Sequence, residues 1–350
     1  MSTGLAKYFE DFVEKLLARS GITMSRNKDG GFDFLAISEK GTSAAIELKL
    51  YSSGSVSPAL LQSAAAAVAY AAQKHNLSKS ILVTNVIVPT GLQLELLNSL
   101  GVIIYDYAVL SGLASSYLDL AQEWESLVGL TRVFRFDSGP ESKPTGAPID
   151  PIRAFDAPLP LSFSVATQLP PPSTKGAHIA TEIEKIPTGK SGAGAFEKKC
   201  TEALKYIFAE DLAAWHMQEM SDTSMNRYDL IARISSDEDF WRCLVRDFRA
   251  RYVIFEFKNY TEQITQKEIY TTEKYLYPAA MRAAAIVISR QGADENALSA
   301  ARGALRESGK LIINLTIADV RSMLESRDRG ESGADVLVEH LDRMLMRIER

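Results

Sequence analysis

The sequence predicts an α/β fold with two domains, each a mixed central sheet flanked by helices. Continuous apolar runs of strand length alternate with amphipathic helical segments, which is typical of a sheet covered on both faces. The same order of segments then occurs a second time along the 350-residue chain. A chain of this length is long enough to build two separate hydrophobic cores.

The segment between the two copies is rich in Pro, Gly, Ser and Thr and holds ten of the chain's 13 prolines. Such a composition buries little apolar surface, so we expect a semi-extended linker over residues 137–192. The two domains are therefore expected at residues 1–136 and 193–350. An apolar stripe over residues 335–348 predicts a final helix that docks on its own domain, with a partner-binding helix as the alternative.

The first copy is expected to open with a helix around Phe9 and Phe12, followed by an apolar run that carries Asp33. Strands are then expected at 44–49, 80–85 and 100–106, with a helix over 58–72 between the first two and another helix before the third. The second copy repeats this order from a helix around Phe196 through an apolar run that carries Asp229. Its strands are expected at 253–258, 285–290 and 308–315, with a helix from 265 to about 276.

The second copy is longer between its aspartate and its glutamate, which predicts an inserted loop or helix over roughly residues 235–251 beside the site. Four arginines lie in this insertion, at positions 242, 246, 249 and 251. They suit either a phosphate-contacting element or a solvated charged face, and the sequence leaves both open.

The strands at 44–49 and 253–258 both end in Glu-x-Lys, and each follows an aromatic-Asp pair on an earlier apolar run. The residues concerned are Asp33, Glu47 and Lys49 in the first copy and Asp229, Glu256 and Lys258 in the second. Two carboxylates can hold a hard divalent cation, and a neighbouring lysine can orient or deprotonate a water. The duplicated pattern predicts metal-dependent cleavage of phosphodiester bonds.

These motifs resemble the PD-(D/E)xK nuclease superfamily, in particular the Mrr-like restriction endonucleases. The resemblance covers both domains and includes the Phe-Glu pair on each opening helix and the Asp-Gly-Gly-x-Asp turn at 29–33. It implies that Mg²⁺ (or Mn²⁺) binds to the Asp and Glu side chains, that each lysine positions the attacking water, and that a helix glutamate supports each metal site. The residues so implied are Asp33, Glu47, Lys49 and Glu10 in the first domain and Asp229, Glu256, Lys258 and Glu197 in the second.

A further motif of this family, Gln-x-x-x-Tyr on the helix after the core strand, fits Gln266 and Tyr270. Those side chains would lie one helical turn apart. The first copy lacks the motif, because Ala66 stands four residues after Gln62. Both copies also lack the proline of the superfamily's name. The alternative for the first domain is therefore a degenerate copy retained as a binding or structural half.

Composition limits the remaining function classes. The net charge of −5 does not suit a protein that coats nucleic acid generally. Two distant cysteines exclude a disulfide framework and a thiolate zinc site. No apolar run reaches the roughly 18 residues of a membrane span, and no signal peptide is visible, so we expect a cytoplasmic protein.

The function predicted from the sequence is a Mg²⁺-dependent endonuclease acting on nucleic acid, which by family analogy is DNA, in restriction or anti-phage defence. Its partners would include a possible second copy or a larger defence complex that supplies specificity. The alternative is a nucleic-acid-binding or scaffold subunit in which one or both nuclease-like domains are inactive.

Overall fold

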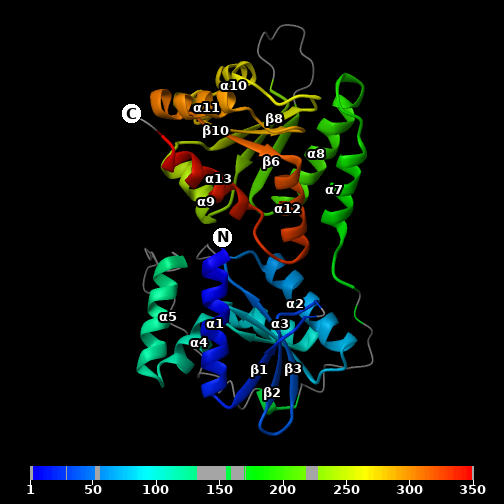
Figure 1. Ribbon diagram of the computed structural model, residues 1–350, viewed down its shortest axis with the longest axis vertical. Helices are drawn as coiled ribbons and strands as arrows, with labels where there is room; N and C mark the ends of the chain where they lie inside the picture. Colours follow the sequence, from blue (N-terminus) through cyan, green and yellow to red (C-terminus); the bar gives the residue numbers. More distant parts are fainter. Residues whose placement is uncertain are drawn as a thin grey trace. The chain divides into compact units, whose positions relative to one another are not determined.

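The computed structural model describes residues 3–28, 30–51, 56–131, 155–158, 169, 171–217 and 228–348. The chain divides into two compact units. The first domain comprises Met1–Ser173 together with the short segment Arg329–Glu331, and the second comprises Thr174–Asp328 with Ser332–Arg350. Each holds a five-stranded sheet flanked by helices (Figure 1), which confirms the predicted α/β class.

The two sheets have the same topology. In the first, the order is β1-β2-β3-β4-β5, in which the first two pairings are antiparallel and the last two are parallel. In the second, β6 to β10 are arranged in the same order with the same directions. The internal repeat expected from the sequence is therefore present at the level of strand order and direction.

The described elements of the first domain are α1 (Thr3–Arg19), β1 (Ile22–Arg26), β2 (Phe34–Ser38), β3 (Ser43–Lys49), α2 (Pro58–Lys74), β4 (Lys79–Thr84), α3 (Thr90–Leu100), β5 (Val102–Tyr105), α4 (Tyr107–Ala114) and α5 (Leu118–Thr131). Those of the second are α7 (Lys175–Lys185), a short 3-10 turn (Lys190–Gly192), α8 (Ala193–Ile207), β6 (Leu212–Met217), β7 (Leu230–Ile234), α9 (Asp239–Arg246), β8 (Tyr252–Lys258), α10 (Gln266–Glu273), a second 3-10 turn (Pro278–Ala280), β9 (Ala284–Ser289), α11 (Glu295–Ser308), β10 (Leu311–Thr316), α12 (Ile317–Asp328) and α13 (Ala334–Met346).

Each sheet separates two hydrophobic layers, because successive side chains of a strand point to opposite faces. On β3, Ile46 belongs to the same core cluster as Phe12 of α1, whereas Ala45 belongs to the cluster that contains Leu61 of α2. Glu47 and Lys49 continue the alternation of Ala45 and therefore lie on the α2 face. On β8 the corresponding layers are formed with α8 on one face and with α10 and α11 on the other.

The second domain begins earlier than the sequence predicted. Helix α7 lies inside the segment expected to be a linker, and its Ile179 and Ile183 are buried in the core of the second domain. The amide of Gly176 donates to Asp328 at 2.9 Å, and a Cβ on Gly176 would lie 2.2 Å from the Leu324 carbonyl oxygen. A glycine is needed for this close approach of α7 to α12, and the expected boundary at residue 193 moves to 174.

The insertion of the second domain forms helix α9, but the expectation that it lies beside the site is wrong. Strand β7 runs antiparallel to β8, and Leu230 pairs with Phe255 while Arg233 pairs with Tyr252. The insertion, which follows β7, therefore begins at the end of the sheet opposite to Lys258. Two of its arginines pair locally, Arg242 with Asp239 and Arg246 with Asp247, which favours the charged-face interpretation.

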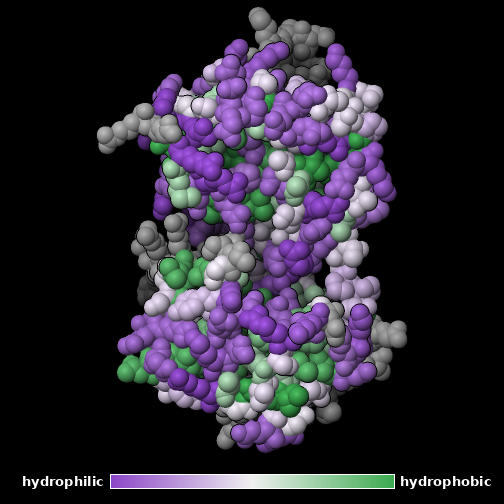
Figure 2. Space-filling model, viewed as in Figure 1, coloured by the Kyte–Doolittle hydropathy of each residue, from purple (hydrophilic) through white to green (hydrophobic). Residues whose placement is uncertain are grey.

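Helix α13 docks on its own domain, as expected, through buried Leu337 and Leu341. The face shown in Figure 2 is largely hydrophilic, with apolar side chains in scattered groups. None of the helices in the described ranges combines the length and the apolarity that crossing a bilayer would need.

Candidate active sites

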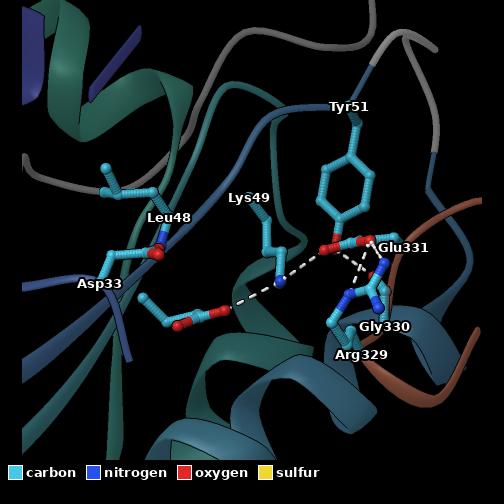
Figure 3. A network of polar contacts seen from close by, with 8 residues as sticks. Asp33, Leu48, Lys49, Tyr51, Arg329, Gly330 and Glu331 are labelled. Atoms are coloured by element: carbon cyan, nitrogen blue, oxygen red, sulfur yellow. Dashed lines mark hydrogen bonds and ion pairs between the residues drawn. The ribbon is translucent and has the colours of Figure 1, made fainter. Parts of the chain in front are cut away.

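The first candidate site lies where β3 ends. Glu47 and Lys49 project from the same face of the strand, and the Lys49 Nζ lies 2.8 Å from Glu47 Oε1. Asp33 immediately precedes β2, the neighbouring strand, and its Oδ2 accepts a hydrogen bond of 2.7 Å from the Leu48 amide. The three residues singled out in the sequence are thus brought together, with Asp33 fixed on the backbone between the other two (Figure 3).

A glycine turn presents Asp33 to this strand end. Gly30 and Gly31 have φ values of 78° and 93°, which lie in the left-handed region that glycine adopts without strain. The Asn27 side-chain amide donates to the carbonyls of Gly30 and Phe32 and holds the turn together. Asp29, the first residue of the Asp-Gly-Gly-x-Asp motif, lies outside the described residues.

A second carboxylate, which no sequence motif indicates, also reaches Lys49. Glu331 Oε1 accepts from Lys49 Nζ at 2.9 Å, and Arg329 holds the other oxygen of Glu331 at 2.8 Å. The hydroxyl of Tyr51 donates to the Gly330 carbonyl at 2.9 Å (Figure 3). The segment Arg329–Glu331 is therefore bound by two residues of this strand end, Lys49 and Tyr51. Lys49 is therefore shared between two carboxylates and is only 6% exposed.

The second candidate site has the same construction at the end of β8. Asp229 Oδ2 accepts from the Phe257 amide at 2.7 Å, which reproduces the contact of Asp33 with Leu48. Lys258 Nζ lies 2.6 Å from Glu256 Oε2 and 4.0 Å from Asp229 Oδ2. The other oxygen of Glu256, Oε1, is enclosed and has no hydrogen-bond partner among the described residues.

Burial sets the protonation of these groups. It raises the pKa of Glu256 to about 7, with the Asp229 charge adding to the shift and Lys258 opposing it. Burial likewise raises the pKa of Asp33 and of Glu47. Burial disfavours the charge on each lysine, but the neighbouring carboxylates outweigh it and raise the pKa of Lys49 and of Lys258. Both lysines are therefore cationic at neutral pH.

The donor set fits a hard divalent cation. Mg²⁺ is commonly held by one or two carboxylates, with water and substrate phosphate completing its shell. Each site supplies one Asp and one Glu, and Glu256 Oε1 is a buried oxygen that lacks a partner among the described residues. Within those residues no group of three or more His, Cys, Asp or Glu side chains is arranged to hold a metal.

The two helix glutamates occupy the opening helices. Glu10 on α1 is bound by Arg26 Nη1 at 2.5 Å, and its charge contributes to the raised pKa of Asp33, which places it in the electrostatic environment of the first site. Glu197 is half-buried on α8, next to buried Phe196. The supporting role implied for both by the resemblance stays a prediction.

Gln266 and Tyr270 both lie on α10, where Thr265 and Glu268 cap the first turn. Both side chains are exposed, with Tyr270 49% exposed, and neither forms a hydrogen bond with Glu256 or Lys258 in the described part of the chain. Gln266 and Tyr270 therefore lie on the helix after the core strand, as the motif predicts, but among the described residues they form no hydrogen bond with the carboxylates of the second site.

Two residues outside the sequence motifs hold the edge of the second site. Asn259 follows Lys258 and donates to the carbonyls of Pro187 and Gly189 at 2.8 and 3.1 Å. Arg290 follows β9, donates to Asn259 at 3.2 Å and lies 5.0 Å from the ring centre of Phe196. The sequence signal that could have indicated these two residues is their position, because each is a polar residue directly after an apolar strand.

Asn85, which follows β4 in the first domain, has a related part. Its side-chain amide exchanges two hydrogen bonds of 2.8 Å with the backbone of Tyr51. In both domains an asparagine that directly follows a central strand thus fixes the chain next to the candidate site. Asn85 both donates to and accepts from main-chain groups, whereas Asn259 donates to main-chain carbonyls and accepts from the Arg290 side chain.

Comparison with known proteins agrees with this geometry in the first domain. Residues 4–88 match the family Mrr_cat, described as a restriction endonuclease. A 98-residue stretch is 32% identical to the putative transposon gamma-delta 80.3 kDa protein of Escherichia coli (strain K12), covering 28% of this chain and 14% of that protein. No solved structure gives a significant match.

The matched range contains Glu10, Asp33, Glu47 and Lys49, and this family is one of nucleases, whose substrate is nucleic acid. The strand order of the first domain is repeated in the second. Residues 4–88 thus match a restriction endonuclease domain, which is consistent with the PD-(D/E)xK nucleases that the sequence resembles.

Proposed function

We propose that this protein is a Mg²⁺-dependent endonuclease that hydrolyses phosphodiester bonds in DNA and carries two active sites of the same type. The observation that carries the proposal is the repeated arrangement of the sites. In each, an Asp accepts from the amide between Glu and Lys, and the Lys pairs with the Glu at 2.8 or 2.6 Å.

The residues would divide the reaction between them. Asp33 with Glu47, and Asp229 with Glu256, would hold the cation, which supplies Lewis-acid stabilisation of charge on the scissile phosphate when bound. Lys49 and Lys258 are cationic, so each would orient the attacking water and stabilise negative charge that develops on phosphate oxygens. The enclosed position of Glu256 strengthens these electrostatic interactions, because little bulk water screens them.

Two working sites on one chain could cut both strands of a duplex, which homodimeric enzymes achieve with two subunits. Restriction or anti-phage defence in the cytoplasm is the setting that we propose by family analogy, with specificity supplied by a second copy or a larger complex.

The second candidate function is a binding or scaffold subunit in which the first site is inactive. One observation favours it. Lys49 is engaged by Glu331 as well as by Glu47, whereas Lys258 pairs with Glu256 at 2.6 Å and is 4.0 Å from Asp229. A lysine held between two carboxylates is less available to a water or phosphate.

Incubation of the whole chain with supercoiled plasmid in Mg²⁺, Mn²⁺ or EDTA tests the proposal, with single-stranded DNA and RNA as parallel substrates. We expect cleavage of DNA in either metal, none in EDTA, and none by the Lys49→Ala/Lys258→Ala variant. The thermal midpoint, measured with and without each metal, separates the alternatives, since an intact carboxylate pair binds the cation and stabilises the fold. Metal-independent cutting, or cutting by the double variant, would refute the proposal.

A further inference from the structure

The second domain contains a cavity of about 260 Å³ that the proposed cleavage reaction does not use. Its lining comes mainly from the edge strand β10 and from helices α11 and α13. Apolar side chains, among them Leu298 and Met344, form part of its wall, and Asn314 of β10 is its most deeply buried polar residue. This volume is slightly below the roughly 300–1,000 Å³ of typical small-molecule sites, so it suits a small ligand.

Asn314 is the first of the observations that point to a ligand. Its side chain is only 8% exposed, and neither Nδ2 nor Oδ1 has a hydrogen-bond partner among the described residues. An unpaired buried amide costs free energy, because the group loses its hydrogen bonds to water on folding. A ligand with both an acceptor and a donor would satisfy it.

The position of Asn314 relates the cavity to the proposed active site. Strand pairing aligns Glu256 with Val287 and Val287 with Asn314, so the three residues form one row across the parallel part of the sheet. Neighbouring strands are about 4.8 Å apart, which puts Asn314 on the order of 10 Å from Glu256 on the same face.

The first domain supplies an internal reference for this row. There the aligned residues are Glu47, Leu82 and Ile104, and Ile104 is buried in the apolar core. The fold therefore accepts an apolar side chain at the position of Asn314. Packing alone does not require the amide.

Positive charge surrounds the cavity. Arg302 of α11 and Arg343 and Arg347 at the end of α13 line it, and none of the three has an ion-pair partner among the described residues. His340, also in the lining, pairs with Asp319 at 3.3 Å and so has its own carboxylate. Arginine side chains recognise phosphate through paired N–H groups.

We propose that this cavity binds one nucleotide, with the Asn314 amide paired to the edge of the base and the arginines on its phosphate. Asparagine offers a carbonyl acceptor and two N–H donors, which match the donor and acceptor on a base edge. The apolar wall would pack against the ring. The inference goes beyond the proposed cleavage, since binding here does not require the carboxylates. The nucleotide comes either free from solution or from a strand in which it is unstacked.

The test uses the whole chain in the Lys49→Ala/Lys258→Ala background, so that cleavage cannot consume the probe. Binding of the four deoxynucleoside monophosphates and of inorganic phosphate is measured by calorimetry. Binding of a single-stranded oligonucleotide containing 2-aminopurine is followed by fluorescence. The variants are Arg343→Gln and Asn314→Ile, the latter chosen because Ile104 occupies the equivalent position in the first domain. Arg306→Gln is the matched control, since Arg306 lies on α11, pairs with Glu307 and does not line the cavity.

We expect Asn314→Ile to weaken binding about 10-fold or more, as the loss of a paired buried amide implies, and to leave the thermal midpoint unchanged or higher. Arg343→Gln should weaken binding several-fold and Arg306→Gln should not. An effect on monophosphates identifies a free nucleotide, and an effect confined to the oligonucleotide identifies one within a strand. Equal binding by the parent and Asn314→Ile, or no binding of any probe by the parent, would overturn the proposal. Because the parent is cleavage-deficient, neither result depends on the nuclease assignment.

Discussion

The two candidate sites share a frame and differ in how the lysine is held. In both, an aspartate that precedes an antiparallel strand accepts from the amide between Glu and Lys at 2.7 Å. Lys49 then lies between Glu47 and Glu331, whereas Lys258 has Glu256 as its close partner and Asp229 at 4.0 Å. Under the proposed function, the shared frame implies common chemistry, and the difference makes Lys258 more available to a water or phosphate than Lys49.

The domains also differ around their sites. Strands β2 and β3 are joined by a short turn in which the backbone of Ser38 donates to Thr42 and accepts from Gly41, but β7 and β8 are joined through α9. Ile104 fills the third position of the row that begins at Glu47, and Asn314 occupies that position in the second domain. The second copy thus carries polar and charged features that the first lacks.

The largest expected effect comes from the aspartates. We expect Asp33→Asn combined with Asp229→Asn to lower the initial rate of plasmid cleavage by roughly 10²–10⁴-fold, because the amide can still accept from the backbone but no longer offers a charge to the cation. Initial rates at several Mg²⁺ concentrations measure this. Full activity of the double variant would show that the shared frame is structural only.

The next largest effect concerns the pH dependence of stability and arises in the insertion of the second domain. Glu238 stands at the N-cap of α9, accepts from Ser332 at 3.1 Å and has its other oxygen enclosed without a partner among the described residues. Burial, reinforced by the charges of Asp211 and Asp335, raises its pKa to about 8. The folded state therefore holds a proton that the unfolded state releases above a pH of about 4.5.

It follows that the stabilising contribution of Glu238 is complete below that pH and is lost as the pH rises toward 8. We expect Glu238→Gln, which keeps a neutral side chain, to be more stable than the parent at pH 8 by on the order of 3 kcal/mol and similar to it at pH 5. Denaturant unfolding at both pH values measures the difference. An equal difference in stability at the two pH values would show that Glu238 does not titrate between them and would contradict its raised pKa.

The smallest effect concerns the extra carboxylate on Lys49. Glu331→Gln should leave Lys49 with Glu47 as its charged partner and make the first site resemble the second. In a Lys258→Ala background, where only the first site reports, we expect the nicking rate to rise by about 3- to 10-fold, as the loss of one charged hydrogen bond implies. Glu325→Gln, which removes the same charge from α12, is the matched control. A fall in rate would show that Glu331 assists the site.

Much of this architecture could be predicted from the sequence, because the information is local. The Glu-x-Lys ends of β3 and β8, the aspartates before β2 and β7, and the repeated order of helices and strands all follow from short motifs and apolar periodicity. Helix α7 was missed because the proline-rich composition of its surroundings masked the Ile179 and Ile183 stripe.

The rest depends on long-range placement. Glu331 meets Lys49 across 282 positions of sequence, and no local pattern indicates such a contact. Asn314 becomes notable only once strand register aligns it with Glu256. The position of α9 could have been derived, since an antiparallel β7 must leave the sheet at the end opposite to Asp229.

The most direct test of two working sites is the product pattern of supercoiled-plasmid cleavage by Lys49→Ala, Lys258→Ala and the double variant in Mg²⁺. If both sites cut, one on each strand, the parent yields linear plasmid, each single variant yields nicked circles, and the double variant leaves the plasmid intact. Linear product at the parental rate from either single variant would contradict the account, because one site would then suffice for both strands.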